Sequence, residues 1–271
     1  KKLNKAFSKF KPTVVVHLAA QAGVRYSIKK PRVYLDSNIT GSYNIIEISK
    51  KTKVKHLVMA SSSSVYGANK KIPFKEIDKT ETQLSIYAAT KKSNESMAHS
   101  YSNIWKIPIT MLRFFTVYGP WGRPDMALFK FTKNILEDKE IDVYNNGNHS
   151  RDFTYVDDIV EGIYLSSISK KELIDSNFDS KNPSRSFCKS IIFNLGRGKP
   201  ENLEDFIDEI ENNLGKRAKR NLMPLQPGDV PDTSADISGL KDFSGYEPKT
   251  SIKIGVKNFI DWYKEYYKVN L

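Results

Sequence analysis

The sequence has 271 residues and a single cysteine, Cys188. One cysteine cannot form an internal disulfide, which fits a reducing compartment, so we predict a cytoplasmic protein. Apolar runs of transmembrane length are also absent, and we expect no membrane partner. No internal repeat or low-complexity segment is evident. These absences favour an ordinary globular chain, and 271 residues are enough for one large domain or two small ones.

Acidic residues are fewer than basic ones, 31 against 43, which leaves a net charge of +12. A basic balance suggests an acidic partner such as nucleic acid, an anionic membrane or an anionic small molecule. The densest basic patch is Lys216, Arg217, Lys219 and Arg220, which follows Gly215 at an expected helix end. Cations there suit the helix dipole and solubility, and no nucleic-acid recognition motif accompanies them, so we predict no nucleic-acid partner.

Metal-ligand clusters are also missing. Asp157 and Asp158 stand together at the expected start of a helix, where acidic residues cap the helix and favour its dipole. No further ligand set accompanies them. We therefore predict no metal site.

The most informative stretch runs from residue 56 to residue 91. An apolar run, His56 to Ala60, predicts a buried strand, and the four serines Ser61 to Ser64 follow its carboxyl end. A helical stretch further on carries Tyr87 and Lys91, which are four apart and therefore share one helix face. Ligands of open α/β sheets bind outside the carboxyl ends of the strands. The pattern indicates a proton-transfer site.

The chemistry of this trio can be stated. A phenol with a pKa of about 10 is a poor base at neutral pH, and a neighbouring ammonium favours its phenolate. A serine hydroxyl that reaches the same substrate oxygen would relay or orient the proton. Tyr-x-x-x-Lys occurs by chance on many exposed helices, so the motif alone is weak. The serine block at the preceding strand end makes it far more specific.

Seven strings extend the pattern over nearly the whole chain, from Val16 to Thr233. They are HLAAQAGVRYSI, DSNITGSYNIIE, ASSSSVYG, YAATKKSNE, LRFFTVYGPWGRPDMALFKF, SRDFTYVDDIV and PLQPGDVPDT. In order and spacing the chain resembles the extended short-chain dehydrogenase/reductase family. More narrowly, it is similar to the nucleotide-sugar 4-epimerases that act on UDP-glucuronate.

The resemblance implies an α/β fold: a Rossmann-like, doubly wound parallel sheet that binds NAD, and a smaller C-terminal α/β domain for the nucleotide sugar. The NAD-binding domain is expected at residues 1–118, with 152–198 partly returning to it, and the substrate domain at 119–271. A homodimer is also implied. The expected reaction is NAD-dependent conversion of UDP-glucuronate to UDP-galacturonate through a 4-keto intermediate.

The resemblance also assigns residues. Tyr87, Lys91 and Ser62 are the expected catalytic residues, with Ser61, Ser63 and Ser64 as alternatives to Ser62. The expected cofactor-binding residues are Leu18, Ala19, Ala20, Gln21, Asn38, Ala60, Ser61, Tyr87, Lys91 and Phe115. The expected substrate-binding residues are Ser62, Ser63, Ser64, Thr116, Arg123, Arg151, Gln226 and Asp229.

Two departures from the galactose-type epimerases favour the uronate branch: Thr116 stands where they usually carry Asn, and Gln226 where they tend to carry Arg. Oxidation of a UDP-uronate at its 4-position makes a β-keto acid, which readily loses carbon dioxide. Its carboxylate must stay hydrogen-bonded, because desolvating it would promote that loss. Ser63, Ser64 and Thr116 offer short hydroxyl donors, and Arg123 adds charge.

Local patterns predict the remaining elements. Thr13–Leu18 is typical of a strand buried on both faces. Residues 31–51 predict one long helix, in which a mid-helix Asn38 is ordinarily tolerated surface. Further strands are predicted at 109–115, at 191–195, and at 141–144 and 151–156 around an Asn-Gly turn. Helices are predicted at 1–10, 126–136, 203–214 and 252–267, the last with an aromatic run suited to a core or an interface. Residues 169–190 read as an irregular, lid-like loop.

A Gly-x-x-Gly-x-x-Gly fingerprint, with which the family begins, occurs nowhere. We expect about two strand-helix units, roughly 60 residues, to be missing before residue 1. The remaining sheet would then expose an apolar edge, and this chain alone would bind NAD poorly or not at all.

Alternatives remain open. Another epimerase of the family, a dehydratase or a decarboxylase would use the same scaffold. Dehydratases carry an Asp-Glu pair and decarboxylases a Glu where this chain has Ser63 and Ser64, and dehydration without an acid is disfavoured. A cofactor-free, inactive fragment is the non-enzymatic alternative.

Overall fold

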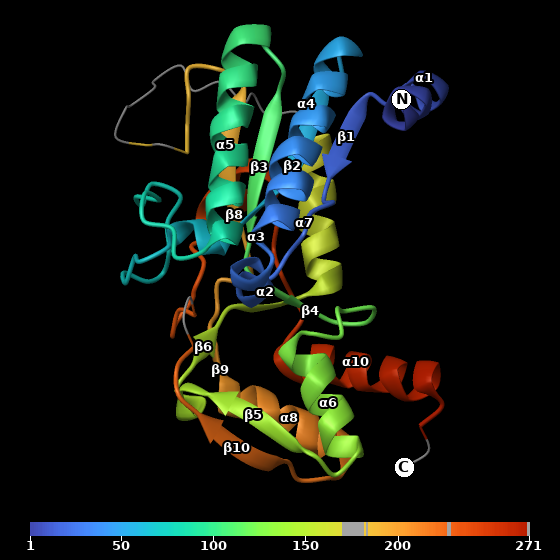
Figure 1. Cartoon of the computed structure of the whole chain (residues 1–271), viewed down its shortest axis with the longest axis vertical. Coiled ribbons are helices and arrows are strands. Elements are labelled where there is room, and N and C mark those ends of the chain that lie inside the picture. The colour runs from blue at the N-terminus through green and yellow to red at the C-terminus, as the bar shows by residue number, and fades with distance from the viewer. Residues whose placement is uncertain (170–181, 183, 227–228, 270–271) are drawn as a thin grey trace. The chain divides into compact units, whose positions relative to one another are not determined.

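The computed structural model describes residues 1–169, 182, 184–226 and 229–269, and its contacts divide the chain into two compact units (Figure 1). Unit 1 comprises Lys1–Phe114, Glu161–Leu195 and Asp236–Tyr246, and unit 2 comprises Phe115–Val160, Gly196–Ala235 and Glu247–Leu271. The first unit thus ends four residues earlier than the expected boundary at 118, and 161–195 return to it rather than 152–198. The roles assigned to the two parts stay predictions.

Unit 1 is built on a parallel four-stranded sheet in the order β1-β2-β3-β8. The strands are β1 (Val14–His17), β2 (His56–Ser62), β3 (Ile109–Phe114) and β8 (Ser190–Leu195). Every neighbouring pair in this sheet runs parallel, so the carboxyl ends of all four strands lie at one edge. In the register of β2 with β3, Ser61 lies opposite Arg113.

Helices cover both faces of this sheet. Leu57 and Met59 of β2 pack with Ile46 of α4 (Gly41–Lys51) and Ala98 of α5 (Ile86–Trp105), and these two helices lie side by side in Figure 1. His56, on the alternate face of β2, faces Ser167 of α7 (Val156–Ile168) through Nδ1 and the Ser167 carbonyl, 3.3 Å apart. The predicted α/β class, with a doubly wound parallel sheet, is confirmed.

Strand β1 corrects one prediction, because it is not buried on both faces. Val14 and Val16 are 38% and 41% exposed, and Leu18 beyond them is exposed as well. The reason is that, among the residues that the structure describes, β1 pairs with β2 alone and forms one edge of the sheet. The predicted exposed apolar edge is therefore present. Helix α1 (Lys2–Phe10) precedes it and buries Phe7.

The predicted long helix at 31–51 exists, but its middle is wider than an α-helix. It is α3 (Pro31–Tyr34), a π-helical turn η1 (Leu35–Thr40) and then α4. The short helix α2 (Val24–Lys29) precedes it. The π turn contains Asn38, which is fully buried, so the interpretation of a mid-helix Asn as tolerated surface is wrong.

The serine block does not simply follow β2. The strand continues through Ser61 and Ser62, and Ser63–Tyr66 form a single 3-10 turn, η2. Gly67 ends that turn with φ +58, and a Cβ there would collide with the Thr82 carbonyl. Only glycine fits this exit without strain.

Unit 2 is smaller and mixed. Its strands are β4 (Thr116–Tyr118), β5 (Glu140–Tyr144), β6 (Ser150–Arg151), β7 (Phe153–Tyr155), β9 (Glu201–Asn202) and β10 (Lys219–Met223). Its helical elements are α6 (Ala127–Leu136), the 3-10 turn η3 (Asn145–Gly147), α8 (Leu203–Leu214) and α10 (Ile252–Tyr267), and α9 (Ser238–Ser244) belongs to unit 1.

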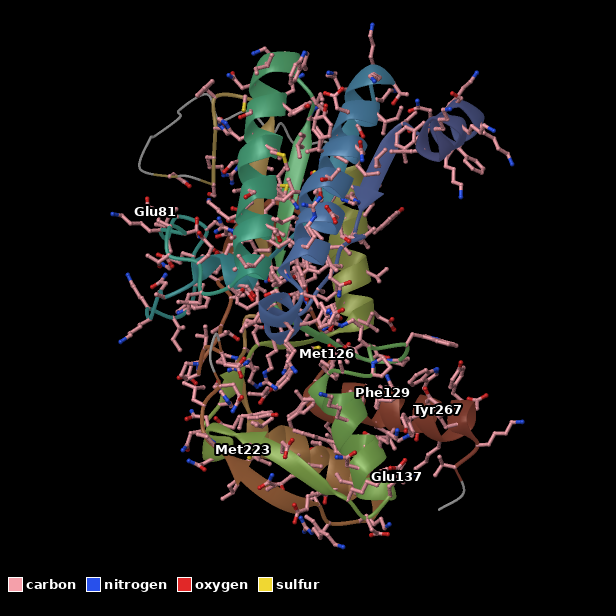
Figure 2. All side chains as sticks on the ribbon, viewed as in Figure 1. Glu81, Met126, Phe129, Glu137, Met223 and Tyr267 are labelled. Carbon is pink, nitrogen blue, oxygen red and sulfur yellow. The ribbon has the colours of Figure 1, made fainter. Side chains whose placement is uncertain are left out.

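An aromatic and aliphatic core joins α6, α8 and α10 of unit 2. Phe153 and Phe206 stack with their ring centroids 4.1 Å apart. Phe129 and Tyr267, both labelled in Figure 2, meet edge to face at 5.8 Å. Of the predicted aromatic run on α10, Phe259 and Tyr263 are buried in this core, whereas Tyr266 is exposed. Only part of the aromatic run therefore belongs to the core.

The predicted strands on either side of the Asn-Gly turn are present as β5 and as β6 and β7, but they do not pair with one another. Strand β5 pairs in parallel with β10, β6 pairs with β9, and β7 pairs in parallel with β4. Asn145 and Asn146 both adopt left-handed backbone conformations inside η3. The turn therefore separates strands that take partners from distant parts of the chain, and no hairpin forms there.

The basic patch also differs from its prediction, because Lys219 and Arg220 lie on β10 and not at a helix end. Three of its side chains are paired with acids: Lys216 with Asp138 at 2.8 Å, Arg217 with Glu211, and Arg220 with Glu204. These pairs neutralise much of the local charge.

No helix among the described residues is long and apolar enough to cross a membrane. The predicted lid-like loop at 169–190 lies mostly outside the described residues.

Candidate active site

The Tyr87/Lys91 helix is fixed to the end of the serine strand. Lys91 is 4% exposed, and its ammonium donates to the Ala60 carbonyl of β2 at 2.9 Å. Tyr87 is one turn earlier on α5 and partly exposed, so both side chains lie on the face turned toward β2. Burial lowers the pKa of Lys91 to about 8. The strand end thus has a cation that stays mostly protonated at pH 7.

His17, the last residue of β1, lies near this cation. Its Nε2 is 3.1 Å from the Ser42 hydroxyl, which also accepts from the Asn94 amide at 3.1 Å. Burial, and after it the charge of Lys91, lowers the pKa of His17 to about 4. His17 is therefore neutral at pH 7, and Lys91 supplies the positive charge.

Asn38 connects the turn after β1 to the helix of Tyr87. Its Oδ1 accepts from the Gln21 amide at 2.8 Å, and its Nδ2 donates to the Gln21 carbonyl at 3.0 Å. The same Nδ2 donates to the Thr90 hydroxyl at 3.0 Å. That hydroxyl in turn donates to the Tyr87 carbonyl at 2.8 Å. Because Asn38 is fully buried, these bonds fix Gln21 relative to α5.

Tyr34 gives the same region a second support. Its hydroxyl donates to the carbonyls of Ala22 and Gly23 at 3.0 and 2.6 Å. Its ring meets the Tyr87 ring edge to face, with centroids 6.1 Å apart. The turn at 21–23 and the Tyr87 ring therefore contact one buried side chain.

The four serines have different surroundings. Ser61 is buried and donates to Glu95 Oε1 at 2.7 Å. Ser62 is buried and accepts from the Ser64 amide at 3.2 Å, which caps η2. Ser63 and Ser64 are partly exposed. The Ser61 side chain could contact a cofactor only as an acceptor, because its hydroxyl proton is donated to Glu95.

Sequence reasoning missed a buried polar network beside these serines. Glu95 accepts from Arg113 twice, at 2.9 Å from Nε and 3.0 Å from Nη2. The Arg113 guanidinium lies 4.8 Å from the Tyr66 ring centroid, and the Tyr66 hydroxyl donates to Asn194 at 2.6 Å. The available signal was an arginine inside the apolar strand 109–114, which implies a buried partner.

Unit 2 holds the other predicted residues. Phe115 is buried, and the partly exposed Thr116 donates its amide to the Asp152 carbonyl at 3.1 Å. The Asp152 carboxylate accepts from the amides of Arg197, Gly198 and Ala235. Burial raises the pKa of Asp152. Asp152, which follows Arg151 in the chain, therefore links Thr116 to the segments at 197–198 and 235.

Arg151 and the loop at 224–233 meet through Pro231, whose carbonyl accepts from the Arg151 guanidinium and from the Ser150 amide. Asp229 turns back on Gln226, with its amide 3.1 Å from the Gln226 carbonyl. Arg151 thus contacts, through Pro231, the segment that also carries Asp229. Arg123 is different, since it is exposed and pairs with Asp125 at 3.3 Å.

The acidic pair Asp157 and Asp158 was predicted to cap a helix and to favour its dipole, and only part of this prediction holds. Asp157 and Asp158 are in the first turn of α7, as the dipole argument predicts. Asp158, however, accepts from the amides of Lys249 and Thr250, at 3.2 and 3.0 Å. Within the described ranges no group of three His, Cys, Asp or Glu side chains is placed to hold a metal ion.

Comparison with known proteins gives three kinds of match. Residues 1–173 match the model of the NAD dependent epimerase/dehydratase family. The chain is 55% identical to protein CapI of Staphylococcus aureus over 98% of this chain and 80% of that protein. It is 46% identical to a probable UDP-glucuronate 4-epimerase of Rhizobium meliloti (strain 1021), over 98% and 79%.

Among solved structures, the UDP-glucuronic acid 4-epimerase of Bacillus cereus in complex with UDP-glucuronic acid and NAD superposes with a TM-score of 0.87. The two chains are 34% identical, and the match covers 98% of this chain and 79% of that one.

Proposed function

Because the chain belongs to the NAD-dependent epimerase/dehydratase family, we propose that it catalyses the NAD-dependent 4-epimerisation of a UDP-sugar, interconverting UDP-glucuronate and UDP-galacturonate. The observation that carries the proposal is the bond of the Lys91 ammonium to the end of the serine strand, one helical turn from Tyr87. That arrangement suits removal of a proton from a sugar hydroxyl.

The residues around β1 fit NAD. Leu18, Ala19 and Ala20 are exposed at the carboxyl end of a parallel strand, and two of them have side chains small enough for a ligand to approach the backbone. Asn38 and Lys91 add a fixed turn and a cation beside it. NAD held there would supply the hydride acceptor and donor for carbon 4 of the sugar.

The chain's own residues manage the proton. Tyr87 as phenolate takes the proton of the 4-hydroxyl and returns it when the hydride comes back. The Lys91 ammonium favours the phenolate electrostatically. Ser62 orients the reacting oxygen. In unit 2 we assign Arg151 to the diphosphate, because a guanidinium fork suits phosphate oxygens, and Gln226 and Asp229 to uridine and ribose.

The uronate is the substrate that the serine turn suits best. Ser63 and Ser64 are partly exposed beside the buried Ser62, so two short hydroxyl donors remain open to a carboxylate. In unit 2 we propose Thr116 and Arg123 as further substrate-binding residues. Hydrogen bonds to the carboxylate keep the 4-keto acid from losing carbon dioxide.

We expect the NAD-loaded protein to interconvert the two UDP-uronates at least about tenfold faster than UDP-glucose and UDP-galactose. The double substitution Ser63→Ala and Ser64→Ala should raise the share of decarboxylated UDP-pentose, because two carboxylate donors are removed. Product analysis by anion-exchange chromatography measures both. Ser244→Ala, a half-buried serine on α9, is the control. Equal rates on neutral and acidic sugars, with no extra pentose, would remove the uronate assignment.

We also propose that the protein is a homodimer held through α4 and α5. Tyr43 of α4 and Ile104 and Trp105 of α5 are large apolar side chains exposed to solvent. Ile104→Asp should therefore shift the sedimentation coefficient from dimer to monomer, whereas Ile254→Asp on α10 should not. A monomeric unmutated protein at micromolar concentration contradicts the proposal.

The proposed location is the cytoplasm. Cys188 is a buried free thiol, which suits a reducing compartment. Cell fractionation tests this, and recovery in a secreted fraction would contradict it.

A further inference from the structure

Three consecutive turns of α5 carry Tyr87, Lys91 and Glu95, spaced four residues apart on one face. Two of them bind consecutive residues of β2. Lys91 donates to the Ala60 carbonyl at 2.9 Å, and Glu95 accepts from the Ser61 hydroxyl at 2.7 Å. The next residue along the strand is Ser62. The position of Ser62 relative to Tyr87 is therefore set by two side chains from the helix of Tyr87.

Arg113 extends this support to the other end of the serine segment. It lies opposite Ser61 on β3, binds Glu95 through two nitrogens, and has its guanidinium against the Tyr66 ring. Tyr66 ends the 3-10 turn that begins with Ser63. The segment from Ser61 to Tyr66 is thus held at both ends by one buried ion pair.

The pair has little contact with solvent. Arg113 is 1% and Glu95 3% exposed, and Lys92 reaches Glu95 from the surface side, at 3.2 Å. Burial works to raise the pKa of the Glu95 carboxyl, but the Arg113 guanidinium outweighs it and lowers the pKa. Both groups therefore stay charged.

Stability alone is a weak reason for such a pair. Well-packed apolar residues of similar volume are often as stable as a buried ion pair or more so. Apolar side chains, however, could not accept from Ser61. The polar pair supplies a hydrogen bond at one end of the serine segment and a cation–π contact at the other, which apolar packing cannot.

We propose that Glu95 and Arg113 are positioning residues that hold the serine segment 61–66 in register with Tyr87 and Lys91. The inference rests on the proposed function for its kinetic consequence. Neither residue touches the substrate. Each acts through a neighbour, Glu95 through Ser61 and Arg113 through Tyr66.

Two variants separate positioning from stability. Glu95→Gln keeps an acceptor for Ser61 but leaves the Arg113 charge buried without its partner, so its melting temperature should fall while kcat of the folded protein stays within about threefold. The double variant Glu95→Leu/Arg113→Met should stay stable but release Ser61. Its kcat should fall about tenfold to a hundredfold, because small misplacements of reacting groups have effects of that size.

Of these two variants, the less stable one, Glu95→Gln, should thus be the more active. A purely structural role of the ion pair would not produce this result. Ser61→Ala tests the same bond without touching the ion pair, and should lower kcat several-fold with KM for the UDP-sugar nearly unchanged. Glu211→Gln is the matched control. Glu211 is a buried carboxylate of unit 2 bound to Arg217, and its loss should affect stability without changing kcat of the folded protein.

Hydrogen exchange of the peptide covering residues 59–66 gives a readout that needs no turnover. It should be faster in the double variant and in Ser61→Ala than in the unmutated protein. If the unmutated NAD-loaded protein does not turn over UDP-uronates but exchange still rises, the proposed function fails and the positioning role stands. If the unmutated protein is active, the positioning role is overturned by either of two results. One is that neither kcat nor the hydrogen exchange of this peptide changes in the double variant or in Ser61→Ala. The other is that kcat of the variants falls in the same order as their melting temperatures.

Discussion

Tyr87→Phe is expected to lower the rate of epimerisation by about a thousandfold or more while the protein stays folded. The substitution removes only the phenolic oxygen, and a positioned general base typically contributes about 10² to 10⁴ in rate. The ring that meets Tyr34 at 6.1 Å is retained, so the packing of α5 against the helix at 31–51 should not change. Turnover of UDP-glucuronate and the melting temperature together measure the effect.

The matched control is Tyr164→Phe, which removes the same oxygen from an exposed ring on α7. It should change neither quantity. Substantial turnover by Tyr87→Phe would mean that another group removes the proton, and the role of the Tyr-x-x-x-Lys pair would have to be abandoned.

Lys91→Met is expected to abolish turnover and yet to make the protein more stable at neutral pH. Lowering the pKa of a buried lysine from 10.5 to about 8 corresponds to roughly 3 kcal/mol. The charged form is therefore less stable in the folded state than in the unfolded chain. Loss of the bond to the Ala60 carbonyl offsets about 1 kcal/mol, so we expect a net gain of about 1–2 kcal/mol at pH 7.

The stability gain of Lys91→Met should depend on pH in a definite direction. Below pH 8 both the folded and the unfolded states hold the proton, and the full penalty of the buried charge is present. As the pH rises from about 8 to 10.5, the folded state loses the proton first and the penalty disappears. The advantage of Lys91→Met should thus be largest near pH 7 and shrink toward pH 10.

Urea unfolding of the apoprotein at several pH values measures this without any turnover. Lys264→Met is the control, because Lys264 also donates to a backbone carbonyl, that of Asn213, but is only half-buried. A destabilised Lys91→Met at pH 7, or a gain that does not depend on pH, would show that the buried ammonium is not under the strain that its burial implies.

The sequence was most informative where spacing is local. The helix with Tyr87 and Lys91, the helix at 203–214 and the strand before the serines were all predicted, because the periodicity that defines them lies within one element. The four-residue spacing of Tyr87 and Lys91 was also enough to place both on one face.

Features that depend on distant pairing could not be predicted in this way. Arg113 looked like part of a buried apolar strand, and its partner Glu95 lies on a helix whose approach only the fold determines. The pairing of β5 with β10 joins segments far apart in the chain, and a local turn signal carries no information about such a partner. The prediction that β1 is buried on both faces was wrong for the same reason, since a run of valines does not show which strands flank it.

The π-helical turn at Leu35–Thr40 makes the site depend on the length of this segment as well as on its residues. Each residue of an α-helix turns the chain by about 100°. Losing one residue from the turn would restore regular winding, but it would also rotate Asn38 and Tyr34 relative to α4 and away from Gln21 and the 22–23 carbonyls that they bind. A relative with every site residue intact, but one position shorter here, should therefore be regarded as having lost the site.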